Sequence, residues 1–153
     1  MGIKRVGHVV IKMRDLEKAK QFYCGVLGMK IGNESPRGMF LRFDDYHHDI
    51  AIFKTGDDAE PPQENQVGLV HIALVTDGVQ AVREMYDRCK AMGVEIVGTT
   101  DHDITNSLYV KDPEGNTIEI YAETDYDWRA GGMGFRSKPF DIEAVSPAAK
   151  VGA

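Results

Sequence analysis

The chain has 153 residues, of which 42% are hydrophobic and 27% are charged, a composition that predicts an ordinary soluble globular protein. Its net charge of −6 and its pI near 5.3 argue against nucleic acid or an anionic membrane surface as the main partner. We expect neither a signal peptide nor a membrane span. The two cysteines fall in predicted amphipathic helices, where packing is a better interpretation than a disulfide, and this suits a cytoplasmic location.

The sequence contains an internal repeat. Three segments of the first half recur in the second half, in the same order and at nearly constant spacing. The matched pairs are GHVVI at 7–11 with VHIAL at 70–74, LGMKI at 27–31 with MGVEI at 92–96, and IAIF at 50–53 with IEIY at 118–121. One such match arises easily by chance, but three in order indicate a duplicated structural unit.

Each half shows the same predicted elements in chain order. An apolar strand comes first, a helix with apolar residues at spacings of three and four follows, and three short strands complete the unit. Gly28 and Gly93 come just after the helices, where a left-handed residue is favoured. The predicted strands are 5–12, 29–33, 38–44 and 48–54 in the first half, and 68–76, 94–98, 106–111 and 116–122 in the second.

The predicted fold class is therefore α+β, with two βαβββ modules at about residues 3–54 and 68–122. Residues 55–67 form a polar linker between the modules, and residues 1–122 form a single domain. The segment 123–153 lacks a clear period and is predicted to be an irregular C-terminal arm.

Three side chains become candidate metal ligands because of the duplication. His8 and His71 occupy equivalent places on the first strand of each half, and Glu119 lies on the last strand of the second half. Each residue alone has an ordinary explanation, as a hydrogen-bonded core histidine or an exposed charge. Together, two imidazoles and one carboxylate match the facial triad of non-haem Fe(II) enzymes, which also accepts Mn(II) and, less readily, Zn(II). The alternative is a site that no longer binds metal.

The motifs GHVVI, VHIALV and NTIEIY resemble those of the vicinal oxygen chelate superfamily over about residues 3–122. That superfamily includes glyoxalase I, fosfomycin resistance proteins, bleomycin-binding proteins and type I extradiol dioxygenases. The resemblance implies that the paired modules form a cupped, mixed-sheet half-barrel around one metal ion. In glyoxalase I the last strand of both modules supplies a glutamate, whereas this chain has Ala51 in the first module.

The segment from Tyr46 to Ile52 instead resembles the extradiol segment that carries an acid/base histidine, which maps onto His48. Tyr109 falls where that family has a tyrosine that hydrogen-bonds the substrate or the iron-bound oxygen. His102 lies near a third family histidine, although its spacing differs. Without the family match, the pair His47 and His48 could be a surface turn, and Tyr109 a half-buried strand aromatic.

The resemblance thus implies a one-domain extradiol-type dioxygenase that cleaves a catechol-like ring with O2 in aromatic compound catabolism. Its implied cofactor is Fe(II), with Mn(II) or another divalent metal as alternatives, and its partners are a small aromatic substrate and O2. We expect a homo-oligomer, and the modules could pair within one chain or across a dimer. Two other functions remain open: another metal-dependent enzyme of this superfamily (a glyoxalase-like lyase, epimerase or thiol transferase), or a non-enzymatic protein that binds an aromatic ligand or drug.

Overall fold

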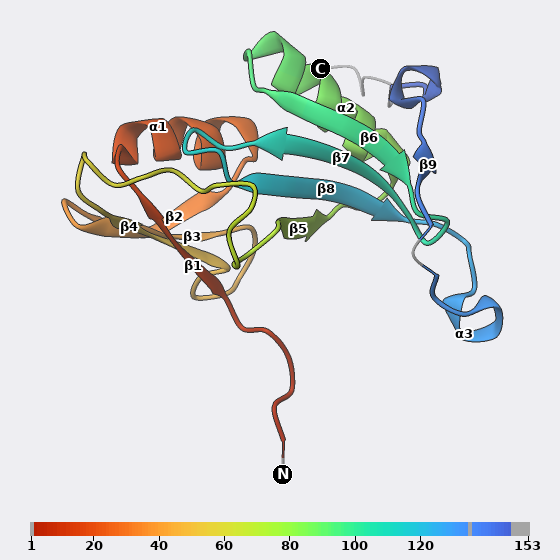
Figure 1. Cartoon of the computed structure of the whole chain (residues 1–153), viewed down its shortest axis with the longest axis horizontal. Helices are drawn as coiled ribbons and strands as arrows, with labels where there is room; N and C mark the ends of the chain where they lie inside the picture. The colour runs from red at the N-terminus through yellow and green to blue at the C-terminus, as the bar shows by residue number, and fades with distance from the viewer. Residues whose placement is uncertain (1, 135, 148–153) are drawn as a thin grey trace. The chain divides into compact units, whose positions relative to one another are not determined.

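The computed structural model describes residues 2–134 and 136–147. The chain divides into two compact units, Met1–Gln63 and Glu64–Ala153, and each unit contains its own sheet (Figure 1). No helix within these described residues is both long enough and apolar enough to cross a bilayer.

The sheet of the first unit has the order β1-β4-β3-β2, with β1 and β4 parallel and the other pairs antiparallel. Asp15 begins the helix, because its Oδ1 accepts hydrogen bonds from the backbone N–H groups of Glu17 and Lys18 at 3.0 and 3.1 Å. The helix continues as a π-helical segment. The elements are β1 (Val9–Met13), α1 (Leu16–Lys20), η1 (Gln21–Val26), β2 (Lys30–Ser35), β3 (Gly38–Arg42) and β4 (Ile50–Lys54).

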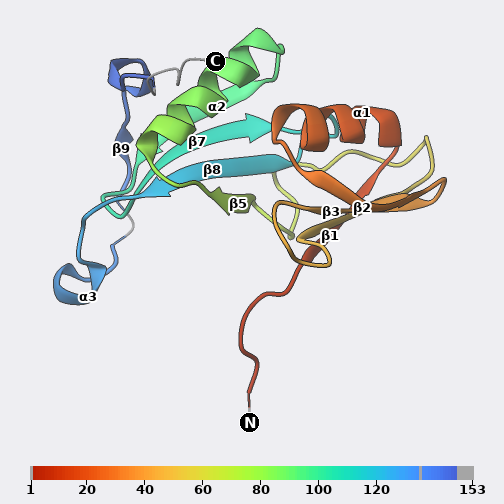
Figure 2. The same cartoon turned by 180° about the vertical axis from the view of Figure 1, so that it is seen from behind.

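The second unit repeats this arrangement, with the sheet order β5-β8-β7-β6-β9 and with β5 and β8 parallel. Helix α2 covers one face of the sheet, as Figures 1 and 2 show from opposite sides. The elements are β5 (Ile72–Val75), α2 (Val79–Ala91), β6 (Ile96–Asp101), β7 (Thr105–Lys111), β8 (Thr117–Glu123), α3 (Trp128–Gly131), β9 (Lys138–Pro139) and η2 (Ile142–Ala144).

These two mixed sheets, each with a helix after its first strand, confirm the predicted α+β fold class. The registers also agree with the repeat, because the second residue of β1 lies opposite Ala51 and the second residue of β5 lies opposite Glu119. Gly28 and Gly93 have φ values of 78° and 68°, as expected for the residues that end the two helices. Cys24 and Cys89 are free thiols.

Both leading strands begin four residues later than the sequence pattern predicts. The strand predicted from residue 5 begins at Val9, and the strand predicted from residue 68 begins at Ile72. His8 and His71 therefore each stand immediately before a strand, so the two histidines keep equivalent positions.

The C-terminal segment is more regular than the predicted arm. Strand β9 pairs with β6, and the Arg83 guanidinium donates hydrogen bonds to three backbone carbonyls around η2. Asp103 forms an ion pair with Arg136 at 3.0 Å and another with Lys138. These contacts tie the segment to the body of the second unit.

Candidate metal and substrate site

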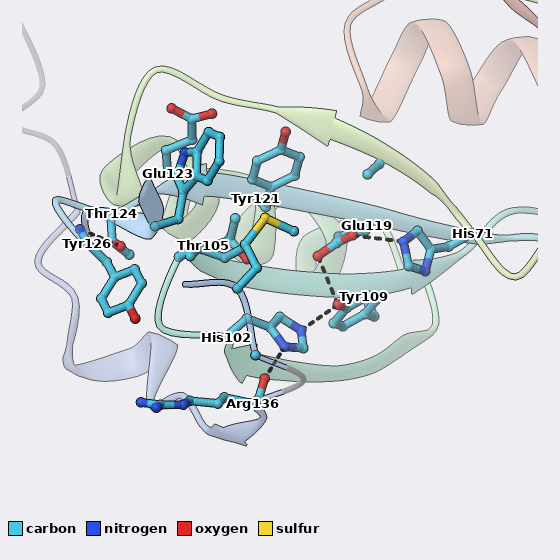
Figure 3. Close-up of a pocket in the computed structure, with 15 residues that line it drawn as sticks. His71, His102, Thr105, Tyr109, Glu119, Tyr121, Glu123, Thr124, Tyr126 and Arg136 are labelled. Atoms are coloured by element: carbon cyan, nitrogen blue, oxygen red, sulfur yellow. Dashed lines mark hydrogen bonds and ion pairs between the residues drawn. The ribbon is translucent and has the colours of Figure 1, made fainter. Parts of the chain in front are cut away.

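Two of the three predicted ligands meet in the second unit. The parallel pairing of β5 and β8 brings His71 beside Glu119, and the distance from His71 Nε2 to Glu119 Oε2 is 3.0 Å. Glu119 is only 8% exposed, and its neighbours Ile118 and Ile120 are buried in the core. Because successive side chains of a strand point to opposite faces, the carboxylate lies on the face opposite these isoleucines. Figure 3 shows His71 and Glu119 pointing toward one another.

A hydrogen-bonded chain extends from this pair. Tyr109 lies directly opposite Glu119 in the β7–β8 register, and its hydroxyl donates to Glu119 Oε1 at 2.8 Å. His102 Nε2 lies 2.9 Å from the same hydroxyl, and His102 Nδ1 lies 2.7 Å from the backbone carbonyl oxygen of Arg136 (Figure 3). That carbonyl can only accept, so Nδ1 must carry a proton. These hydrogen bonds therefore connect Glu119, a candidate metal ligand, to the C-terminal segment.

Tyr109 remains a hydrogen-bond donor across the neutral pH range. Burial and the hydrogen bond to Glu119 raise the pKa of Tyr109 to about 12. The single hydroxyl proton of Tyr109 can form a hydrogen bond to Glu119 or to His102, but not to both at once.

The donor chemistry of the His71–Glu119 pair fits a divalent cation. Metal–nitrogen and metal–oxygen bonds to these side chains are about 2.0–2.2 Å long, so two ligands at right angles lie about 3.0 Å apart. The observed separation of 3.0 Å therefore suits adjacent positions around one ion. A hydrogen bond that orients a ligating carboxylate, such as that from Tyr109, is a usual companion of such sites.

The third predicted ligand, His8, belongs to the first unit. Within the described part of the chain, no three His, Cys, Asp or Glu side chains form a group able to hold a metal. The second unit thus contributes a pair of donors, and the triad of His8, His71 and Glu119 stays a prediction.

His8 has its own surroundings, which include the predicted acid/base residue. The centroids of the His8 and His48 rings lie 4.3 Å apart, and His48 packs on Phe40 with a centroid distance of 4.8 Å. The two Nδ1 atoms of His47 and His48 are 2.7 Å apart, so one of them donates to the other. Partial burial, together with His8 and His47, lowers the pKa of His48. His48 is therefore held in contact with the ring of a predicted ligand.

A pocket of about 540 Å³ opens beside the His71–Glu119 pair, a size suited to a small organic ligand. Its walls come from the pleated face of the second sheet and from the C-terminal segment (Figure 3). Aromatic and sulfur-containing side chains dominate the lining away from the pair, and these are Tyr121, Tyr126, Trp128 and Met133.

Sequence reasoning missed two parts of this site. His102 was only a possible site residue, because its spacing differs from that of the family histidine. The contribution of Tyr126, Trp128, Met133 and Arg136 was not predicted at all. The one available signal was the concentration of large side chains in an otherwise irregular segment.

Comparison with known proteins identifies the family. The Glyoxalase/Bleomycin resistance protein/Dioxygenase superfamily matches residues 5–120. Biphenyl-2,3-diol 1,2-dioxygenase 2 of Rhodococcus globerulus is 30% identical over 116 residues, which are 76% of this chain but only 61% of that enzyme. A probable lactoylglutathione lyase of Synechocystis is 32% identical over 122 residues, which are 74% of this chain and 91% of that protein.

A solved structure supports the same fold. The fosfomycin resistance protein FosX of Listeria monocytogenes, complexed with Mn(II) and sulfate, superposes with a TM-score of 0.65 at 23% identity. The superposition covers 81% of this chain and 94% of FosX. With two mixed sheets, duplicated registers and a family match over most of its length, the chain belongs to the Glyoxalase/Bleomycin resistance protein/Dioxygenase superfamily.

Proposed function

We propose that this protein is a metal-dependent, extradiol-type dioxygenase that cleaves a catechol-like ring with O2. The observation that carries the proposal is the His71–Glu119 pair, held by Tyr109 at the end of an aromatic-lined pocket. The similarity to a biphenyl-diol dioxygenase supports this reaction. The chain spans only about three fifths of the length of that relative, so the proposed reaction is based on the site.

In this proposal His71 and Glu119 bind Fe(II), or Mn(II), and a His8 side chain is the third protein ligand. The sequence leaves open whether that His8 belongs to the same chain or to a second copy. The bound ion would supply a positive charge that lowers the pKa of a catechol hydroxyl and holds the ring near O2. Tyr109 keeps the Glu119 carboxylate oriented by donating to Oε1, so Oε2 faces His71.

His48 is the proposed acid and base. Its Nδ1 is occupied by His47, which leaves Nε2 to accept a proton from a catechol hydroxyl and later to return it to the ring-opened product. The contact between the His48 and His8 rings supports this role, because it places the base beside a proposed ligand. The aromatic lining of the pocket would bind the face of the ring.

A lyase acting on a glutathione thioester is the second candidate. One observation favours it: the chain covers 91% of the Synechocystis lyase but only 61% of the dioxygenase. One observation opposes it: Ala51 is buried and holds the position in the first sheet that Glu119 holds in the second, and it replaces the second glutamate that the glyoxalase I resemblance requires.

The test begins with anaerobically purified protein reconstituted with Fe(II). Catechols should consume O2 and give a yellow ring-opened product, whereas a mixture of glutathione and methylglyoxal should give no rise in thioester absorbance. Glu119→Gln should lose the metal and the activity. Glu84→Gln, at an exposed position of α2 outside the pocket, should keep both. Formation of the thioester, with no uptake of O2 on any catechol, would reject the proposal in favour of the lyase.

A further inference from the structure

The far wall of the pocket comes from a segment beyond the part of the chain that matches the family. The match ends at residue 120, whereas Tyr126, Trp128, Met133 and Arg136 line the same pocket as His71 and Glu119. Figure 3 shows His71 at one end of the pocket and Tyr126 at the other. We call Tyr126, Trp128 and Met133 the distal wall.

The distal wall presents apolar surface that is partly exposed, although the Arg129 guanidinium lies over one face of the Trp128 ring, 4.2 Å from its centroid. Trp128 is 44% exposed and Met133 is 71% exposed, although both are large apolar side chains. Such side chains gain free energy when a ligand removes them from water, at about 25 cal/mol per Å² of apolar surface. Their grouping along one pocket, next to Tyr126 and Tyr121, distinguishes them from single exposed hydrophobic residues.

Specific contacts fix the distal wall in place. The Tyr126 hydroxyl donates to the Gly132 carbonyl at 3.2 Å, which closes the loop around α3. Asp127 begins α3 by accepting from the backbone N–H groups of Arg129 and Ala130. Beyond the loop, the ion pair of Arg136 with Asp103 and the contact of His102 with the Arg136 carbonyl attach the segment to the sheet. The wall therefore stands at a set position relative to Tyr109.

The charges around the pocket define which group the wall can accept. The Arg136 guanidinium is already paired with Asp103, and the remaining charged groups of the lining, Glu119 and Glu123, are acidic. An anionic substituent inside the pocket would be repelled by these carboxylates, and the Arg129 guanidinium, which lies over the Trp128 ring, is outside the lining. An uncharged apolar substituent would instead cover Trp128 and Met133.

We propose that the distal wall selects the substrate, by binding a bulky, uncharged, apolar substituent on the ring whose oxygens face His71 and Glu119. The identity of the reacting ring rests on the proposed function. The preference for an apolar substituent rests on the wall alone. The pocket volume of about 540 Å³ is adequate for a ring with such a substituent.

The first experiment measures binding without catalysis. Trp128 is the single tryptophan of the chain, so its fluorescence reports occupancy of the wall directly. Metal-free protein is titrated with 2-phenylphenol and with phenol. We expect 2-phenylphenol to bind at least about tenfold more tightly, because its second ring is buried against the wall. Met133→Ala should reduce that difference, whereas Met92→Ala, an exposed methionine outside the pocket, should leave it unchanged.

The second experiment measures turnover with Fe(II)-loaded protein. Trp128→Ala and Met133→Ala should lower kcat/KM for 3-phenylcatechol at least about tenfold more than kcat/KM for catechol. Equal affinities for the two phenols, or an unchanged ratio of kcat/KM in both variants, would overturn the role of the wall and leave the dioxygenase proposal standing. Selective binding of 2-phenylphenol without turnover of any catechol would reject the dioxygenase and support the wall.

Discussion

Replacing Tyr109 with phenylalanine tests whether the hydrogen-bonded chain holds Glu119. The change removes one hydroxyl, which donates to Glu119 Oε1 at 2.8 Å and lies 2.9 Å from His102 Nε2. Glu119 is only 8% exposed, so water replaces the lost donor poorly. A hydrogen bond to a charged group is worth about 1.5–3 kcal/mol. We therefore expect the free energy of unfolding of the metal-free protein to fall by about that amount.

The measurement is urea unfolding of metal-free protein followed by circular dichroism. A double-mutant cycle with Glu119→Gln separates the Tyr109–Glu119 coupling from other effects of the two changes. Tyr121→Phe is the matched control, because Tyr121 lines the same pocket but its hydroxyl has no hydrogen-bond partner among the described residues. The same proteins are then titrated with Mn(II). Loss of a hydrogen bond that orients a ligand typically weakens metal binding about 10–100-fold.

Two results together would refute this reasoning. The first is a coupling energy near zero, with Tyr109→Phe as stable as Tyr121→Phe. The second is unchanged Mn(II) affinity in Tyr109→Phe. Tyr109 would then be an ordinary half-buried aromatic of β7, and its contact with Glu119 would play no part in binding a metal.

Three further predictions concern other groups. His48→Gln should keep the bound metal but lose at least about a hundredfold in kcat on catechols, measured by O2 uptake; normal turnover would remove the acid/base role. Lys138 and Arg136 hold the pKa of Asp103 below its usual 3.8, so its stabilising effect is present above about pH 4 and is lost as the pH falls through the lower folded-state value. Asp103→Asn should therefore lose less stability than the unaltered protein between about pH 4 and pH 2 in acid titrations followed by circular dichroism, and an equal loss would contradict this. Removal of the metal with a chelator should abolish turnover, and Fe(II) should restore it; full activity after verified metal loss would exclude a metal role.

The duplicated topology could be predicted because it depends on local patterns. Alternating apolar residues, helical spacing and the glycines after each helix are all visible in the sequence, and both modules formed as expected. The residues at which β1 and β5 begin depend on where their partner strands β4 and β8 lie, and the local sequence pattern does not show this. Strand β1 pairs with β4, which begins at Ile50, so residues 5–8 have no strand opposite them.

The site was predictable to the extent that it follows from the repeat. The equivalence of His8 with His71 and the position of Glu119 come from matching motifs, and the β5–β8 register accounts for the contact of His71 with Glu119. The contact of the Arg136 carbonyl with His102 does not follow from the repeat. It requires the turn at Asp103, which has a φ of 65°, and a chain that returns after β8. Contacts of this kind depend on the tertiary fold.

The parallel pairing of β5 with β8 has a consequence for the energetics of folding. It joins the first strand of the second module to the last, so closing it costs more chain entropy than the neighbouring hairpins do. The His71–Glu119 pair exists only when this closure is complete. An ion that binds the pair therefore stabilises the closed state, by about 2.7 kcal/mol when its concentration is 100 times its Kd. If the proposed site binds metal, the supply of metal would then also affect how often this strand pair opens.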